Sequence, residues 1–307
     1  MRALWLVGAL SALVLAACEP PDETAQKARA CLEAEETEAR IVACTAAAED
    51  DTLPSELRSQ ALSARGDAYQ EGGDVTAALR DYASALEFDE NNPSALLGRA
   101  AILVNSGQLD AAEPLATRAL NANNSSRANE LLGQVALRRG QYPEAIGFFD
   151  AALEHEPRLA TAMSARARAK QRAGDLDGAA EDFNRAIQVN GNLADARAGR
   201  CWLDLNADRE LERARDDADA AVAADPSNVE GQLCRGILQL RDRQWAEAKV
   251  SFDAVLAIDG GNTTALFGRG VARNRGGDRG GTRDMNQARD FESNISDRFA
   301  ELGVNTY

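Results

Sequence analysis

Apolar positions in residues 131–157 follow a helical period, interrupted by a Gly-Gln-Tyr-Pro turn at 140–143. Glycine suits the end of a helix, and proline suits the first turn of the next one. After the turn, Ala145, Phe149 and Ala152 recur at i, i+4 and i+7, which places them on one buried stripe. The two small residues let a neighbouring helix approach closely while the ring fills the gap. The segment therefore predicts two packed antiparallel helices.

The same stripe recurs along most of the chain at intervals of 33 to 35 residues. Glycines mark the turn that precedes the stripe at Gly73, Gly107, Gly140 and Gly174, whereas Arg209 and Arg243 replace glycine later, so we expect less regular turns there. The stripes are Ala78/Tyr82/Ala85, Ala112/Ala116/Ala119, Ala145/Phe149/Ala152, Ala179/Phe183/Ala186, Ala214/Ala218/Ala221 and Ala248/Phe252/Val255.

This pattern resembles the tetratricopeptide repeat family, in which a small residue and a tyrosine in the first helix precede alanine, an aromatic residue, alanine and proline in the second. Gly66, Tyr69, Ala78, Tyr82 and Ala85 match it in one repeat. The resemblance implies an all-α fold, a right-handed superhelical solenoid of antiparallel helix pairs with a C-terminal capping helix. Six repeat units are expected over residues 59–262.

Residues 24–58 precede these units and are expected to form a divergent helix pair followed by a loop. Cys31 and Cys44 are 13 residues apart, as are Tyr69 and Tyr82, which face each other across a helix pair in this family. The resemblance therefore implies a Cys31–Cys44 disulfide, worth about 3 kcal/mol for a loop of this size. Two buried free thiols are the alternative.

A second cysteine pair, Cys201 and Cys234, falls on the first helices of adjacent repeats at similar but unequal phase. Adjacent first helices pack together in such arrays, which would allow a disulfide. The phase difference leaves buried free thiols as an equal alternative.

Residues 263–307 follow the last regular unit and are expected to form a degenerate repeat and a capping helix. Thr282, Asn286 and Arg289 fall where the stripe should be, so no regular second helix is expected. A final stripe of Ile295, Phe299 and Leu302, closed by Gly303, predicts a helix that covers the exposed core of the last repeat.

The first 17 residues have a basic start and a short apolar run, which is typical of an export signal. The sequence Leu15-Ala16-Ala17-Cys18 resembles a bacterial lipobox, which implies lipidation of Cys18 and a tether over residues 18–23. An ordinary cleaved signal is the alternative. We expect the protein in a Gram-negative-type cell envelope. Glu19 follows the cysteine where an inner-membrane retention signal would have aspartate, so we expect the anchor in the outer membrane, facing the periplasm.

The composition of the chain narrows the classes of partner and activity that we expect. The formal net charge of −15 disfavours nucleic acid and anionic membrane surfaces, so the lipid is the expected membrane contact. His155 is the single histidine and falls at a helix end, where an exposed structural role is expected. The glycine-rich residues 276–281 lack a phosphate-loop lysine and are expected to form a connection. No metal, cofactor or enzymatic activity is expected.

A stacked array presents its first helices on a concave groove. In the family's register, the second, fifth, ninth and twelfth positions of each repeat face the groove. These positions are mostly polar in early repeats, for example Arg127, Glu130, Thr161 and Arg168. In late repeats they include the apolar residues Trp202, Leu205, Leu233, Ile237, Leu240, Phe267 and Val271.

An exposed apolar strip of this kind would bind an amphipathic helix or an extended peptide. The alternatives are that the C-terminal helix covers part of the strip, or that the register is shifted by one residue. We therefore expect a lipid-anchored scaffold that binds a protein partner for cell-envelope assembly or remodelling. A periplasmic holdase or carrier that shields apolar segments or lipophilic ligands is the second hypothesis, and an enzyme is the least favoured.

Overall fold

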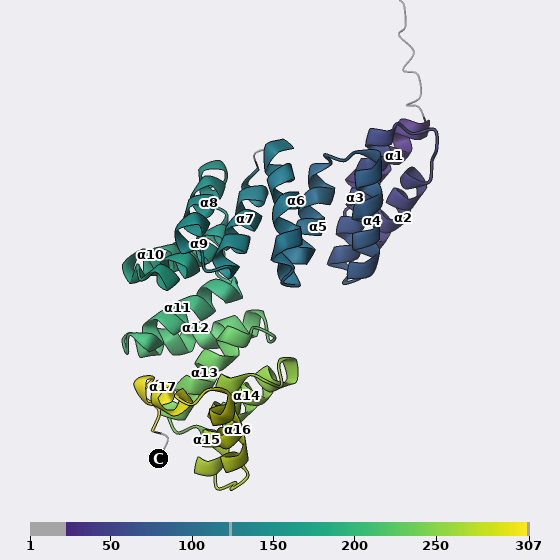
Figure 1. Cartoon of the computed structure of the whole chain (residues 1–307). Helices are drawn as coiled ribbons and strands as arrows, with labels where there is room; N and C mark the ends of the chain where they lie inside the picture. The colour runs from purple at the N-terminus through teal and green to yellow at the C-terminus, as the bar shows by residue number, and fades with distance from the viewer. Residues whose placement is uncertain (1–22, 123–124, 306–307) are drawn as a thin grey trace, which may run out of the picture. The chain divides into compact units, whose positions relative to one another are not determined.

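The computed structural model describes residues 23–122 and 125–305, where it has 17 helices and no strand (Figure 1). The expected all-α class is confirmed. The chain divides into two compact units, and the boundary falls between Ile102 and Leu103, inside α5 (Pro93–Asn105). Across the described residues, no helix is both long enough and apolar enough to cross a membrane.

The first unit contains two antiparallel helix pairs and the start of α5. The pairs are α1 (Glu23–Glu33) with α2 (Thr37–Ala48), and α3 (Ser55–Glu71) with α4 (Val75–Phe88). Tyr82 is fully buried, and a side chain at either Gly66 or Gly98 would overlap its ring. Two glycines thus let one aromatic residue fill the space between helices.

The second unit repeats the arrangement. The helix α6 (Leu109–Ala122) packs against the first of the following pairs, and each pair packs against the next. The pairs are α7 (Ser126–Arg138) with α8 (Tyr142–His155), α9 (Ala160–Ala173) with α10 (Leu176–Val189), α11 (Ala194–Asn206) with α12 (Leu211–Ala224), α13 (Val229–Arg241) with α14 (Trp245–Ile258), and α15 (Thr263–Arg275) with α16 (Gly281–Phe291). The last helix is α17 (Ile295–Glu301). We number the repeats from α3–α4 (first) to α15–α16 (seventh).

The turns inside the pairs depend on left-handed backbone. Gly140 has φ +76°, a conformation that glycine adopts without steric cost. Arg243 takes the same region with φ 60°, so that turn keeps its form without glycine. In the fifth repeat both Asp208 and Glu210 have positive φ, and this turn is the irregular one.

The helix α16 corrects one expectation, because a regular second helix does form in the last repeat. Besides Asp284, its buried residues are Gly281, Met285 and Ala288, each one position before the residues that the regular spacing indicated. A side chain at Gly281 would overlap the carbonyl oxygen of Gly270, so glycine permits this close crossing of α15 and α16. The stripe was therefore misplaced by one residue.

Both cysteine pairs form disulfides in the structure. Cys31 and Cys44 join α1 to α2 with a Cα–Cα distance of 4.4 Å, and both side chains are fully buried. Cys201 and Cys234 join α11 to α13 with a Cα–Cα distance of 6.5 Å. Both distances lie in the range that a disulfide spans without backbone movement. One bond thus closes the first helix pair, and the other links neighbouring repeats.

A recurrent arginine forms a second system of contacts between helices. In the fourth repeat, Arg166 on α9 donates two hydrogen bonds to Asp182 on α10, of 2.6 and 2.7 Å. It donates a third, of 2.6 Å, to Asp150 on α8 of the preceding repeat. One guanidinium therefore connects three helices and two repeats.

Other repeats contain the same contact at the same phase, and we call the set the arginine ladder. Each arginine lies one position before the small residue of the first helix. In its own repeat, it contacts the residue directly before the central stripe residue. In the preceding helix pair, it contacts the residue directly after the central stripe residue. The members are Arg65 with Asp81 and Thr45, Arg166 with Asp182 and Asp150, Arg200 with Asp217 and Asn184, Arg235 with Ser251 and Asp219, and Arg269 with Asp284 and Asp253.

Candidate partner-binding face

The first helices of the third to fifth repeats carry the polar positions that the family register assigns to the groove. We call these positions, together with their counterparts in later repeats, the first-helix face. Arg127 on α7, Thr161 on α9 and Asp195 on α11 are exposed, and Glu130 is half-buried. Burial raises the pKa of Glu130, an effect that the Thr161 hydroxyl and the nearby Arg127 partly oppose. This part of the face offers charges of both signs to a partner.

Arg168 ties the first-helix face together across three repeats. Its guanidinium on α9 lies 2.6 Å from Glu230 Oε2 on α13 and 3.5 Å from Asp195 Oδ1 on α11. The indole nitrogen of Trp202 on α11 donates a hydrogen bond of 3.0 Å to the main-chain oxygen of Glu230. Trp202 is half-buried beside this ion pair. An aromatic side chain next to paired charges is the composition of a typical interface anchor.

The apolar strip expected in the late repeats is not exposed. Trp202 alone keeps partial exposure, and the other six predicted residues join one buried cluster. Their exposed fractions are Leu205 1%, Leu233 9%, Ile237 0%, Leu240 2%, Phe267 0% and Val271 2%. The prediction that these six residues line an open groove is wrong for the free chain.

The C-terminal segment supplies the physical reason. Ile295, Phe299 and Leu302 are buried in the same cluster as Ile237 and Phe267. The rings of Phe267 and Phe299 lie 4.8 Å apart between centroids. Leu302 contributes its carbonyl oxygen, which accepts a hydrogen bond of 3.3 Å from Arg241 Nη1. The capping helix is thus confirmed: α17 packs against α15 and α16, and Leu302 directly after it contacts Arg241, the last residue of α13 (Figure 1).

Cys18, the export signal over residues 1–17 and the tether lie outside the described residues. His155 is exposed at the end of α8, as expected for a helix-end residue. Among the residues that the structure describes, no group of three or more His, Cys, Asp or Glu side chains could hold a metal ion.

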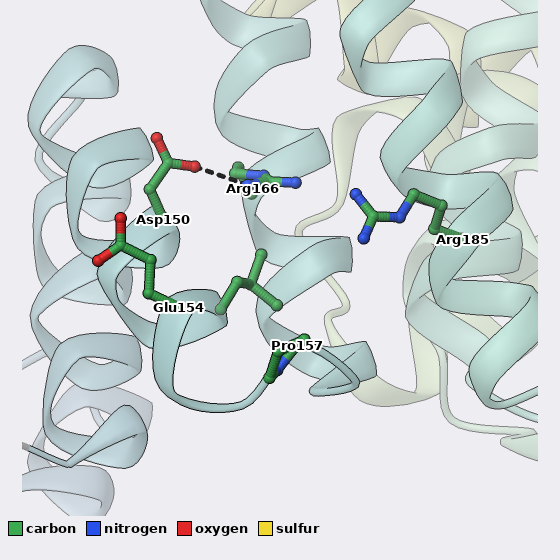
Figure 2. Close-up of a pocket in the computed structure, with 6 residues that line it drawn as sticks. Asp150, Glu154, Pro157, Arg166 and Arg185 are labelled. Carbon is green, nitrogen blue, oxygen red and sulfur yellow. Dashed lines mark hydrogen bonds and ion pairs between the residues drawn. The ribbon is translucent and has the colours of Figure 1, made fainter.

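A pocket on the arginine-ladder side was not predicted from the sequence. It has a volume of about 340 Å³ and lies among α8, α9 and α10, with Arg166 and Arg185 on one side and Asp150 and Glu154 on the other (Figure 2). Leu153 and Pro157 complete the lining. Arg166 is held by its ladder partners, and the pocket combines both charges on a small area. It therefore has no strong preference for an anion or a cation.

Two family models match this chain in adjoining parts. A model described as tetratricopeptide repeat matches residues 97–160, and one described as TPR repeat matches residues 66–107. No curated protein matches the chain. The matched residues include the repeat whose Ala145 and Phe149 are fully buried at the helix crossing.

Solved structures extend the likeness to more of the chain. A chain of the APC/C hetero-tetramer Cut9–Hcn1 is similar with a TM-score of 0.64 and 15% identity, over 76% of this chain and 48% of that chain. PilF of Pseudomonas aeruginosa has a TM-score of 0.55 and 18% identity, over 67% and 94%. A tetratricopeptide repeat protein of Parabacteroides merdae has a TM-score of 0.52 and 16% identity, over 80% and 98%.

At these identities the structures show the fold alone, and this chain spans about half of the Cut9–Hcn1 chain (48%). The helix pairs, the buried Ala–aromatic–Ala stripes and the family matches agree with one another. Residues 66–160 therefore match the tetratricopeptide repeat models, and the described residues have the all-α fold of a tetratricopeptide repeat solenoid.

Proposed function

We propose that this protein is a lipid-anchored scaffold of the bacterial cell envelope that binds a protein partner along the first-helix face of α7, α9 and α11. The observation that carries the proposal is the combination of exposed charges with the half-buried Trp202 beside the Arg168–Glu230 pair. Proteins of this fold class commonly mediate protein–protein contacts. A polar rim around one aromatic anchor fits a peptide or a helix of moderate affinity.

The carrier hypothesis depended on an exposed apolar strip. Six of its seven residues are buried in the free chain. No comparable apolar surface on the described first helices supports a holdase, so we do not propose that function.

Crosslinking and pull-down from native envelope test the scaffold proposal. Arg127 and Thr161 are exposed, so the double substitution Arg127→Glu and Thr161→Glu should leave the fold intact while it removes one positive charge from the face and adds two negative charges. We expect capture of the partner to fall at least about tenfold, as is usual when like charges meet in an interface. Arg185→Glu is the matched control, since Arg185 is an exposed arginine on the second helix α10. Equal capture by both variants would rule out this face.

The anchor is tested separately by labelling cells with a palmitate analogue. The Leu15-Ala16-Ala17-Cys18 sequence predicts that label is incorporated in the wild type and lost in Cys18→Ala. An export signal without lipidation would leave the two proteins equally unlabelled. The outer-membrane location predicts that the labelled protein fractionates with outer-membrane markers.

A further inference from the structure

The surface beneath α17 has the properties of a helix-binding site. It is formed by the first helices α13 and α15, and Ile237, Phe267 and Val271 give it an apolar centre. Thr264 and Arg241 supply polar groups at its edges, where they contact Arg298 and the carbonyl oxygen of Leu302. The occupant, α17, presents apolar residues at i, i+4 and i+7 to it.

The occupant is a short element that tertiary contacts hold in place. The helix has seven residues, which is shorter than a helix that is stable in water alone. It therefore depends on this surface for its structure. Its other side-chain contacts are an ion pair of 2.8 Å between Arg298 and Glu292 and a hydrogen bond of 3.0 Å that Arg289 donates to Ser296. After the helix, Arg275 lies 3.4 Å from the Asn305 side-chain amide oxygen. Releasing α17 leaves the seven repeats with their own stripes.

Trp202 connects this covered surface with the open part of the first-helix face. It packs against the buried cluster that contains Phe299, yet it remains half-exposed beside Glu230. A partner that lies along α9 and α11 would therefore meet α17 at the next repeats. The apolar surface that it would gain there is already shaped for a helix.

We propose that α17 is an internal competitor for a partner's amphipathic helix, which carries apolar residues at i, i+4 and i+7 and docks on α13 and α15 when α17 is released. This inference rests on the proposed function, because the partner is the one that binds the first-helix face. The chemistry of the partner is taken from the segment that the surface already holds. The apparent affinity of the site for the partner's helix is its intrinsic affinity multiplied by the fraction of time that α17 leaves the site free.

The test uses the full chain and a labelled synthetic peptide of residues 293–305 as the probe. Phe299→Asp buries a charge against Phe267 and should release α17, whereas Ala300→Asp places the same charge on the exposed side of the same helix. We expect Phe299→Asp to bind the peptide about ten- to a hundredfold more tightly than the wild type, and Ala300→Asp to bind like the wild type. Equal binding by all three proteins would overturn the proposal.

Hydrogen exchange on the wild type gives a second measurement that needs no variant. The amides of α17 should exchange at least about tenfold faster than those of α13 and α15, because α17 opens locally. Exchange of α17 only through global unfolding would make it a permanent cap and would contradict the inference. Light scattering on the wild type and on Phe299→Asp tests whether a second copy of the chain occupies the surface. A wild-type dimer that is lost in Phe299→Asp would assign the surface to that second copy and would also overturn the proposal.

The two proposals fail separately. If Phe299→Asp does not bind the peptide while envelope capture still depends on Arg127 and Thr161, the competitor role of α17 is wrong and the scaffold stands. If the peptide binds but no envelope protein is captured, the surface beneath α17 is a helix site and the scaffold proposal is wrong.

Discussion

The first and second repeats have the same helical stripe but differ in the arginine ladder. In the first repeat Arg65 donates hydrogen bonds of 2.7 and 2.8 Å to Asp81, whose side chain is buried. In the second repeat Arg99 occupies the equivalent position, but Leu115 replaces the acceptor, and Arg99 makes no ion pair within the described residues. The third repeat has Leu132 at the arginine position. The stripe therefore specifies the helix pair, and the ladder is a separate feature that some repeats lack.

Loss of Arg65 should have the largest effect in this comparison. Arg65→Ala leaves the Asp81 carboxylate buried without its partner, which typically costs about 3–5 kcal/mol. Hydrogen exchange of α3 and α4 measures the loss. Arg99→Ala is the matched control, for which we expect less than about 0.5 kcal/mol. Equal effects of the two substitutions would remove the distinction between the repeats.

Loss of Arg166 should cost less, although it has one more carboxylate partner. Lys170 also lies 2.9 Å from Asp182 Oδ2 and would still neutralise that carboxylate in Arg166→Ala. We expect a loss of about 2 kcal/mol, measured by exchange in α9 and α10. The double variant Arg166→Ala with Lys170→Ala should lose more than the sum of the single variants. Strict additivity would show that Lys170 does not compensate.

Acid should weaken the fourth repeat through the same carboxylate. Burial alone would raise the pKa of Asp182, but hydrogen bonds from Arg166 and Lys170 outweigh it and lower the pKa below its ordinary range. The stabilisation is therefore complete above the unfolded pKa of about 4, and it is lost as the pH falls through the lower folded value. Denaturant unfolding from pH 6 to pH 2 should show a slope below pH 4 that is smaller in Asp182→Asn. An unchanged slope would exclude Asp182 as its source.

Loss of Arg235 should have the smallest effect among ladder residues. Its acceptors are neutral: the Ser251 hydroxyl on α14 at 3.1 Å, and the Gln232 side-chain oxygen at 2.8 Å within α13 itself. The Asp219 carboxylate lies 3.9 Å away and is exposed. A hydrogen bond to a neutral group contributes about 1 kcal/mol, which is the loss we expect for Arg235→Ala. Ser251→Asp would restore the charged acceptor of the other repeats and should raise the stability of α13 and α14 in the exchange experiment. A fall in their stability would mean that the site cannot hold a second charge.

Much of this fold could be predicted because the stripes are local patterns. The recurrence of residues such as Ala145 and Phe149 located the helix pairs and their turns. The position of α16 could not be obtained this way, because Gly281, Met285 and Ala288 lack the alanine–aromatic marker and the connection before them is one residue shorter. The ladder was visible in the sequence as arginine and aspartate at fixed phases, but those positions are polar and do not identify their partners.

The candidate site was harder to predict for a different reason. Periodicity showed that Ile237 and Phe267 lie on an apolar side of their helices, but it left open whether the C-terminal helix covers them or a partner does. Phe299, which is 32 residues beyond Phe267, packs on the Phe267 ring through a tertiary contact. Exposure on a first helix depends on that distant segment. The polar positions of the early repeats have no such cover, and Arg127 and Thr161 are exposed as the register indicated.

The sharing of each ladder guanidinium between neighbouring repeats has a consequence for cooperativity. Asp150, Asn184, Asp219 and Asp253 each interact with an arginine of the following repeat, so the third to seventh repeats form an unbroken series of nearest-neighbour couplings. A repeat that unfolds inside this series removes a hydrogen-bond or ion-pair partner from the arginine of the next repeat. The third to seventh repeats should therefore melt as one unit, with a single sharp transition.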